Sequence, residues 1–139
     1  MTARFVLDAW AILALLQREE PAAARVKTLL EVAQTGQADL AISIINLGEV
    51  VYRVGKAKGE PAAQETLAEL QRLPLEIIPA SEKLVWAAVT WKMHQAISYA
   101  DAFAVATAVQ LDAILLTGDP EIVALTAPVQ VERLTRQRR

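Results

Sequence analysis

The sequence contains no cysteine and only one histidine among its 139 residues. The lack of cysteine excludes disulfide bonds, thiolate zinc sites and a cysteine nucleophile, and it fits a reducing compartment. The one histidine, His94, lies in the helical stretch WKMHQ, remote from every acidic motif, and we assign it no catalytic role. A functional site in this chain must therefore be built from other polar side chains.

The chain also lacks an apolar run of the roughly 20 residues that a helix needs to cross a bilayer. Its start, MTARFVLDAW, reaches Asp8 before a signal-type apolar segment can form. Hydrophobic residues make up 54% of the sequence and charged residues 22%, which argues against disorder. We therefore expect a soluble cytoplasmic protein with no membrane partner, and a single domain spanning residues 1–139.

An excess of positive charge is missing as well, because the formal net charge is −2. The chain as a whole offers no attraction for a polyanion, so a nucleic-acid ligand would need metal ions or a local basic face. The end of the chain, RLTRQRR at residues 133–139, concentrates four arginines. This basic tail is either such a face or a solvated, frayed terminus.

Short apolar segments alternate with longer segments of helical periodicity. Helix starts are indicated by Pro21, by Glu60 with Pro61, and by Ser81. Apolar strands separated by helices of this length indicate an α/β fold with a mainly parallel sheet covered on both faces. In such a sheet, ligands bind beyond the carboxyl ends of the strands. The predicted strands are residues 4–7, 40–43, 75–78, 113–116 and 129–132.

Two tryptophans, Trp86 and Trp91, fall in the helix that follows Ser81. Together with Val85 and Val89, they are predicted to bury one face of that helix. We do not expect them to form a platform on which RNA bases stack.

Three aspartates stand where this fold would place a ligand, although each also suits a helix start. Asp8 directly follows the first predicted strand and Asp119 follows the fourth, and each can cap the helix after it. Ser98 and Asp101 form an S-x-x-D pattern ahead of an apolar helix, which resembles a capping box. Considered one at a time, all three are explained by local structure.

Glu49 is different, because its helix is predicted to begin near Ser43 and a residue so far inside cannot be a cap. The alternative role for Glu49 is an ion pair with Arg53, one turn later, on a solvated surface. Such a pair is worth only about 0.3–0.5 kcal/mol. The sequence leaves open whether Glu49 belongs to this pair or to a site.

The four acids together are harder to explain as caps and surface pairs. The predicted topology brings them all to one edge of the sheet. Converging carboxylates repel one another and raise each other's pKa values unless a cation lies between them. Oxygen ligands without histidine or cysteine suit Mg²⁺ or Mn²⁺. The pattern therefore predicts a divalent metal site at Asp8, Glu49, Asp101 and Asp119.

In the contexts FVLDAWAIL, INLGEVVY, SYADAFAVATA and LLTGD, these acids resemble the ordered motifs of the PIN-domain ribonucleases, and more particularly the VapC-type toxins of toxin–antitoxin pairs. The resemblance runs nearly the whole chain. It implies a three-layer α/β/α domain whose five parallel strands have the order 3-2-1-4-5. It also implies that Asp8, Asp101 and Asp119 surround the metal ion, while Glu49 assists, often through water.

The resemblance further implies metal-dependent hydrolysis of RNA phosphodiester bonds, a cognate antitoxin protein as partner, and a homodimer. Asn46 and Thr117 are candidates for a supporting role around the metal ligands. Arg53 and Lys56 are candidate RNA contacts, or else ordinary exposed helix residues.

The sequence departs from the family pattern at Trp10, because members usually carry Ser, Thr or Asn two residues after the first aspartate. This change removes one polar group from the neighbourhood of the metal. An alternative function also stays open at this point: a catalytically silent adaptor of the same fold that binds RNA or protein.

Overall fold

Five short parallel strands form one sheet at the centre of the protein. The computed structural model describes residues 2–125 and 128–137. The strand order is β3-β2-β1-β4-β5 and every neighbouring pair is parallel, which confirms the expected fold class and order. The predicted strands coincide with the observed ones to within two residues at each end. The strands are β1 (Ala3–Leu7), β2 (Ala38–Ser43), β3 (Glu76–Ile78), β4 (Ile114–Thr117) and β5 (Val131–Arg133).

Seven helices surround the sheet in the described part of the chain. Serine side chains cap three of them, since Ser43, Ser81 and Ser98 each accept a hydrogen bond from a backbone N–H of the first turn. Within the same residues, no helix is both long and apolar enough to cross a membrane. The helices are α1 (Ala9–Leu16), α2 (Ala22–Gln34), α3 (Ile44–Lys58), α4 (Glu60–Gln71), α5 (Glu82–His94), α6 (Tyr99–Gln110) and α7 (Pro120–Val123).

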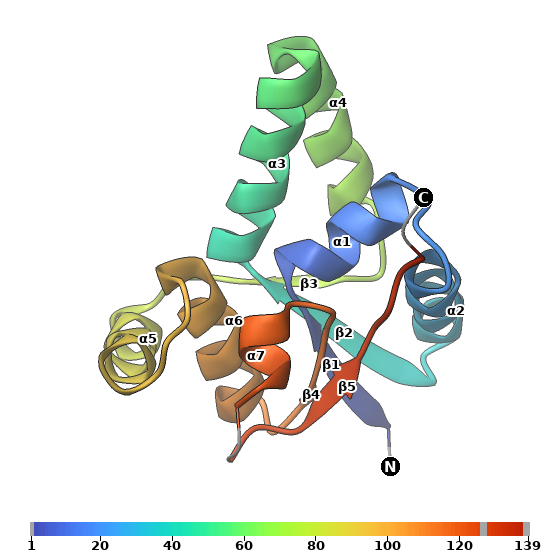
Figure 1. Ribbon diagram of the computed structural model, residues 1–139. Coiled ribbons are helices and arrows are strands. Elements are labelled where there is room, and N and C mark those ends of the chain that lie inside the picture. Colours follow the sequence, from blue (N-terminus) through green and yellow to red (C-terminus); the bar gives the residue numbers. More distant parts are fainter. Residues whose placement is uncertain (1, 126–127, 138–139) are drawn as a thin grey trace.

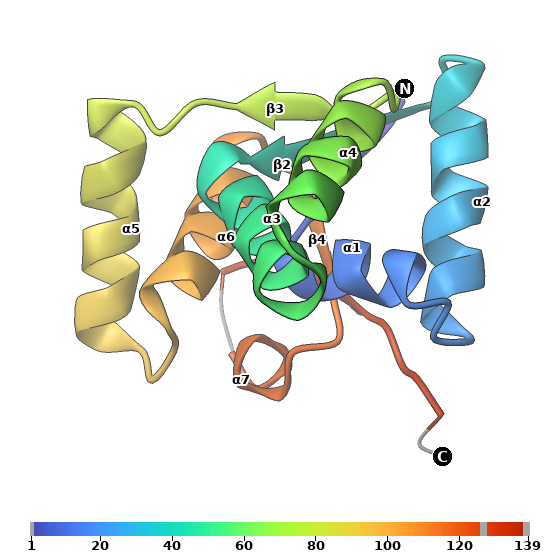
Figure 2. The ribbon, with the colours of Figure 1, turned by 90° about the horizontal axis from the view of Figure 1, so that it is seen from above.

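The two faces of the sheet carry separate hydrophobic cores. Along β1, the buried side chains of Phe5 and Leu7 join one core and that of Val6 joins the other, as the alternation of a strand requires. Residues of α1 and α2 complete the first core, and residues of α5 and α6 complete the second. The helices therefore lie on both sides of the sheet (Figures 1 and 2), which confirms the three-layer α/β/α arrangement.

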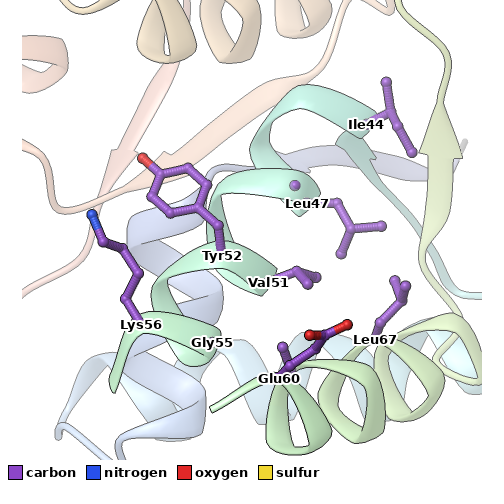
Figure 3. Close-up of a pocket in the computed structure, with 10 residues that line it drawn as sticks. Ile44, Leu47, Val51, Tyr52, Gly55, Lys56, Glu60 and Leu67 are labelled. Carbon is purple, nitrogen blue, oxygen red and sulfur yellow. The ribbon is translucent and has the colours of Figure 1, made fainter. Parts of the chain in front are cut away.

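Helices α3 and α4 form a hairpin that projects away from the sheet (Figure 1). Gly59 connects them with a φ of 95°, a conformation that favours glycine. Gly55 lets the helices approach closely, because a Cβ at this position would lie 3.3 Å from the Cβ of Ala63. A cavity of about 480 Å³ opens along the hairpin (Figure 3). Its lining side chains include Ile44, Leu47, Val51, Tyr52, Lys56, Glu60 and Leu67.

The prediction that Trp86 is buried with Trp91 is wrong. Trp86 is 60% exposed, whereas Trp91 packs against the core formed with α6. Five residues along an α-helix correspond to a rotation of about 140°, so the two indoles cannot share one narrow face. The buried stripe of α5 instead contains Leu84 and Ala88.

Trp10, on α1, packs against the turn between β4 and α7. A Cβ at Gly118 would lie 2.3 Å from Cη2 and Cζ2 of the Trp10 indole, far inside van der Waals contact. The φ of Gly118 is not positive, so the indole, and not the backbone conformation, excludes a side chain there. This contact fixes α1 against the turn that leads into α7.

We expect Gly118→Ala to destabilise the protein by about 1–3 kcal/mol, the usual cost of overpacking. In a Trp10→Ser background the same change should be neutral or slightly stabilising, because alanine restricts the unfolded chain more than glycine does. Denaturant unfolding of the wild type, the two single variants and the double variant measures this coupling. An equal cost of Gly118→Ala in both backgrounds would show that Trp10 is not the cause.

Candidate functional site

Asp8 lies between the carboxyl ends of β1 and β4 and is only 1% exposed. Its Oδ1 accepts a hydrogen bond from the N–H of Ala11 at 2.9 Å, which caps α1. Its Oδ2 accepts a hydrogen bond from the hydroxyl of Thr117. The Thr117 hydroxyl oxygen also accepts a bond from the N–H of Asp119 at 3.0 Å. Thr117 therefore connects Asp8 to the turn that carries Asp119.

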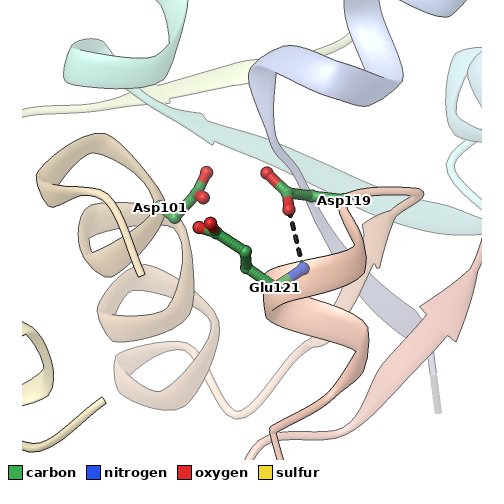
Figure 4. A group of neighbouring side chains, drawn as sticks. All are labelled: Asp101, Asp119 and Glu121. Atoms are coloured by element: carbon green, nitrogen blue, oxygen red, sulfur yellow. Dashed lines mark hydrogen bonds between the residues drawn. The ribbon is translucent and has the colours of Figure 1, made fainter. Parts of the chain in front are cut away.

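Asp101, Asp119 and Glu121 direct their carboxylates toward one another (Figure 4). One oxygen from each residue lies within 4.8 Å of the other two. Asp101 stands in the first turn of α6, where its N–H donates to the hydroxyl oxygen of Ser98 at 3.1 Å. Asp119 caps α7, with its Oδ1 accepting a bond from the N–H of Glu121 at 2.9 Å. The helix starts and the acidic cluster are thus formed by the same residues.

The sequence reasoning missed Glu121. This exposed residue lies in the first turn of α7, two positions after Asp119 and next to Pro120. The available signal was a second acid in the first turn of the helix that Asp119 caps. Glutamate is common at such positions because it interacts favourably with the helix dipole, so the sequence alone did not distinguish it.

Glu49 lines a cavity of about 200 Å³ together with Asp101 and Asp119. It is not one of the three acids whose oxygens lie within 4.8 Å of each other. Its Oε2 accepts a hydrogen bond from Nε of Arg53 at 3.1 Å, so the ion pair named as the alternative is present. The Arg53 side chain is 55% exposed and the Glu49 side chain 17%, so the pair is open to solvent on the arginine side while the glutamate is mostly buried. Glu49 therefore has the ion pair and also faces the acidic cavity.

The candidate supporting residue Asn46 is fully buried in the first turn of α3. Its Nδ2 donates to the carbonyl of Ala100 at 2.9 Å, directly before Asp101. Within the described residues, its Oδ1 has no hydrogen-bond partner. Asn46 thus ties α3 to the turn that presents Asp101.

Burial and crowding change the acidity of two of these carboxyl groups. Burial raises the pKa of Asp8 to about 7, even though its hydrogen bonds to Thr117 and Ala11 act in the opposite direction. Burial, followed by the neighbouring Asp119, raises the pKa of Asp101 to about 7. Without a cation, Asp8 and Asp101 therefore keep their protons up to about neutral pH.

Two arginines line the acidic cavity in the described part of the chain, Arg53 from α3 and Arg136 from the C-terminal segment. The candidate RNA contact Lys56 lies outside this cavity, in a neighbouring groove between α1 and α3 that also includes Arg53. The C-terminal segment is not frayed as far as Gln137, whose N–H donates to the carbonyl of Glu20 at 2.9 Å. Residues 138 and 139 of the basic tail lie outside the described residues.

Comparison with known families identifies the fold. The model of the PIN domain family matches residues 5–127, most of the chain. The chain belongs to the PIN-domain family. A search of curated proteins found no match.

Solved structures share this PIN-domain fold at low sequence identity. A chain of VapBC2 from Rickettsia felis, bound to a promoter DNA fragment, is 20% identical with a TM-score of 0.74, covering 95% of this chain and 99% of that chain. A chain of DNA-bound VapBC from Salmonella typhimurium is 15% identical with a TM-score of 0.71, covering 95% and 98%. VapC20 from Mycobacterium tuberculosis, a sarcin-ricin loop cleaving toxin, is 17% identical with a TM-score of 0.68, covering 86% and 93%. At these identities the similarity shows the fold alone.

The acidic cluster of this PIN domain fits a hard divalent cation. The carboxylates of Asp101, Asp119 and Glu121 supply oxygen atoms at a mutual spacing that one ion can span. Burial chiefly raises the pKa of Asp8, with a further contribution from Asp119 and Glu49, and a nearby cation would act in the opposite direction by favouring the ionised form. Oxygen-only ligation of this kind suits Mg²⁺ or Mn²⁺.

We expect the metal-free protein to lose stability as the pH rises through about 7, the pKa of folded Asp8. The pKa of Asp8 is raised from its ordinary value of 3.8 to about 7 in the folded state. Its contribution to stability is therefore complete below pH 3.8 and is lost by the time the pH has risen through about 7, where folded Asp8 ionises. Asp8→Asn cannot titrate and should show a weaker loss. Melting temperatures in EDTA from about pH 5 to about pH 8 measure the difference. Identical pH dependence of the two proteins would contradict the raised pKa.

Proposed function

We propose that this protein is a metal-dependent ribonuclease that acts as the toxin of a toxin–antitoxin pair. The observation that carries the proposal is the convergence of Asp101, Asp119 and Glu121 at the edge of a PIN-domain sheet, with their oxygens within 4.8 Å of one another. The fold similarity to a toxin that cleaves the sarcin-ricin loop supports RNA as the substrate class. Residues 1–139 would act as a single domain in the cytoplasm, where such RNA is found.

Asp101, Asp119 and Glu121 would hold Mg²⁺ or Mn²⁺ directly. Asp8 would be a further ligand, as the family resemblance implies, and Glu49 would act through water. The bound ion would lower the pKa of a water molecule and neutralise charge on the scissile phosphate. Thr117 orients Asp8 by donating to its Oδ2. Asp101, whose pKa is raised to about 7, would release its proton when the cation binds.

Arg53 and Lys56 would bind phosphates of the RNA beside the metal. Arg53 lines the acidic cavity, and Lys56 lies in the adjoining groove between α1 and α3. Local cations are needed because the chain as a whole carries a formal charge of −2.

The proposed protein partner is a cognate antitoxin. The VapBC complexes of Rickettsia felis and Salmonella typhimurium, which share this fold, support this partner. The acidic cavity is suited to an arginine side chain from a basic antitoxin segment, because carboxylates bind guanidinium in a bidentate way. We also propose a homodimer, as the family resemblance implies.

The purified protein should cleave RNA when Mg²⁺ or Mn²⁺ is present and should stop when EDTA is added. Asp101→Asn and Asp119→Asn should lower the rate by roughly 100-fold or more, since even residues that only support metal ligands cost up to that much. Asp39→Asn is the matched control, because this exposed aspartate lies near the amino end of β2, at the end of the strands opposite to the acidic cluster. Cleavage that persists in excess EDTA would rule out the metal mechanism. A wild type inert on total RNA with either metal would favour the silent adaptor.

The variants Glu49→Gln and Glu121→Gln determine which glutamate belongs to the metal site. Glu49 adds to the repulsion that raises the pKa of Asp8, so Glu49→Gln should leave the metal-free protein at least as stable while activity falls sharply. Activity should also fall for Glu121→Gln, and Glu65→Gln, at an exposed position of α4, is the control. If Glu49 only pairs with Arg53, its replacement should cost at most about 0.5 kcal/mol and leave cleavage unchanged. Melting curves without metal and one nuclease assay distinguish these outcomes.

A further inference from the structure

The two arginines of the acidic cavity are held in different ways. Arg53 is paired with Glu49, which itself lines the cavity. Arg136 is paired instead with Glu19, at 2.9 Å, and Glu19 is not among the lining residues. Arg136 therefore lines the acidic cavity, but its ion-pair partner lies outside the cavity.

The backbone of the C-terminal segment is anchored without help from the Arg136 guanidinium. The N–H of Leu134 donates to the carbonyl of Thr117 at 2.8 Å, and the N–H of Ala22 donates to the carbonyl of Thr135 at 3.0 Å. Leu134 is also buried, with 4% of its surface exposed. None of these contacts involves the side chain at position 136, so the segment has anchors that do not depend on the arginine.

The guanidinium of Arg136 is held in place but still has donors to offer. It lies 5.1 Å from the ring centre of Trp10, within the range of a cation–π contact. Only its Nη1 donates a hydrogen bond to another described residue, Glu19. Arginine carries five N–H donors in a planar fork that matches phosphate oxygens. The ion pair is partly exposed, with 43% of the Arg136 side chain and 28% of the Glu19 side chain accessible, so it is weak enough to exchange for a phosphate.

We propose that Arg136, held against the face of Trp10, binds a phosphate of the RNA at the border of the acidic cavity. The proposal rests on the ribonuclease function proposed above and adds a substrate contact from the end of the chain. Arg53 and Arg136 come from different elements, α3 and the C-terminal segment. An RNA strand that enters the cavity would therefore meet one arginine from α3 and one from the C-terminal segment, both next to the acids. Trp10 then serves as the support that keeps the guanidinium in position.

Steady-state cleavage of a single-stranded RNA oligonucleotide tests the contact. Arg136→Ala should raise KM about tenfold or more, as expected for a charged hydrogen bond, and should change kcat less. Arg136→Lys should be intermediate, because lysine keeps the charge but loses the fork. The slope of log affinity against log salt should fall by about 1 in Arg136→Ala. Arg72→Ala is the control, because it removes the same charge elsewhere. Arg72 is an exposed residue at the end of α4, ahead of β3.

A binding measurement in EDTA separates this proposal from the ribonuclease function. The probe is a fluorescein-labelled single-stranded RNA oligonucleotide of mixed sequence, followed by anisotropy. In a Trp86→Phe/Trp91→Phe background, Trp10 is the only tryptophan, so its fluorescence should change on RNA binding and change less in Arg136→Ala. Weaker binding by Arg136→Ala supports the contact even if no cleavage is found. Wild-type affinity, salt dependence and KM in a folded Arg136→Ala protein would overturn it and would leave the ribonuclease function intact.

Discussion

The buried carboxyl group of Asp8 is the feature on which the site depends. It lies between the ends of the two adjacent strands β1 and β4, where it caps α1 and accepts a bond from Thr117. Burial raises its pKa to about 7, and repulsion from Asp119 and Glu49 adds to the effect. The position follows from the topology, because parallel strands end at one edge and their helices begin there. A cation at this edge would reverse the cost of bringing the acids together.

Local structure and the acidic site are not competing explanations for these residues. Asp119 caps α7 through Oδ1, and the N–H of Asp101 is bound by Ser98, yet oxygens of both carboxylates lie within 4.8 Å of each other. The cap bond restricts how the Asp119 carboxylate can turn, as hydrogen bonds around metal ligands generally do, and the Ser98 cap holds the backbone that carries Asp101. The ion pair of Glu49 with Arg53 acts similarly, because it directs a mostly buried side chain along the cavity.

The sequence predicted the parts of the structure that depend on pattern. Short strands buried on both faces appear as continuous apolar runs, and the rule that ligands bind beyond their carboxyl ends indicated Asp8 and Asp119. Glu121 could not be singled out, because an acid in a first helical turn has an ordinary role there. Arg136 depends on the path of the C-terminal segment, which passes Thr117 and α2 through contacts that no local pattern encodes. Trp86 was misplaced because its angular position on α5, and not its hydrophobicity, decides its exposure.

The central claim is that the carboxylates of Asp101, Asp119 and Glu121 converge to hold a divalent cation. A metal titration of the melting temperature tests this claim most directly. If the claim holds, Mn²⁺ stabilises the wild type as the site fills, by about 2.7 kcal/mol at a hundredfold excess over the dissociation constant. Asp119→Asn should be stabilised far less at the same concentrations. A wild type whose melting temperature is unchanged by Mn²⁺ and Mg²⁺, or a variant that responds equally, would contradict the claim.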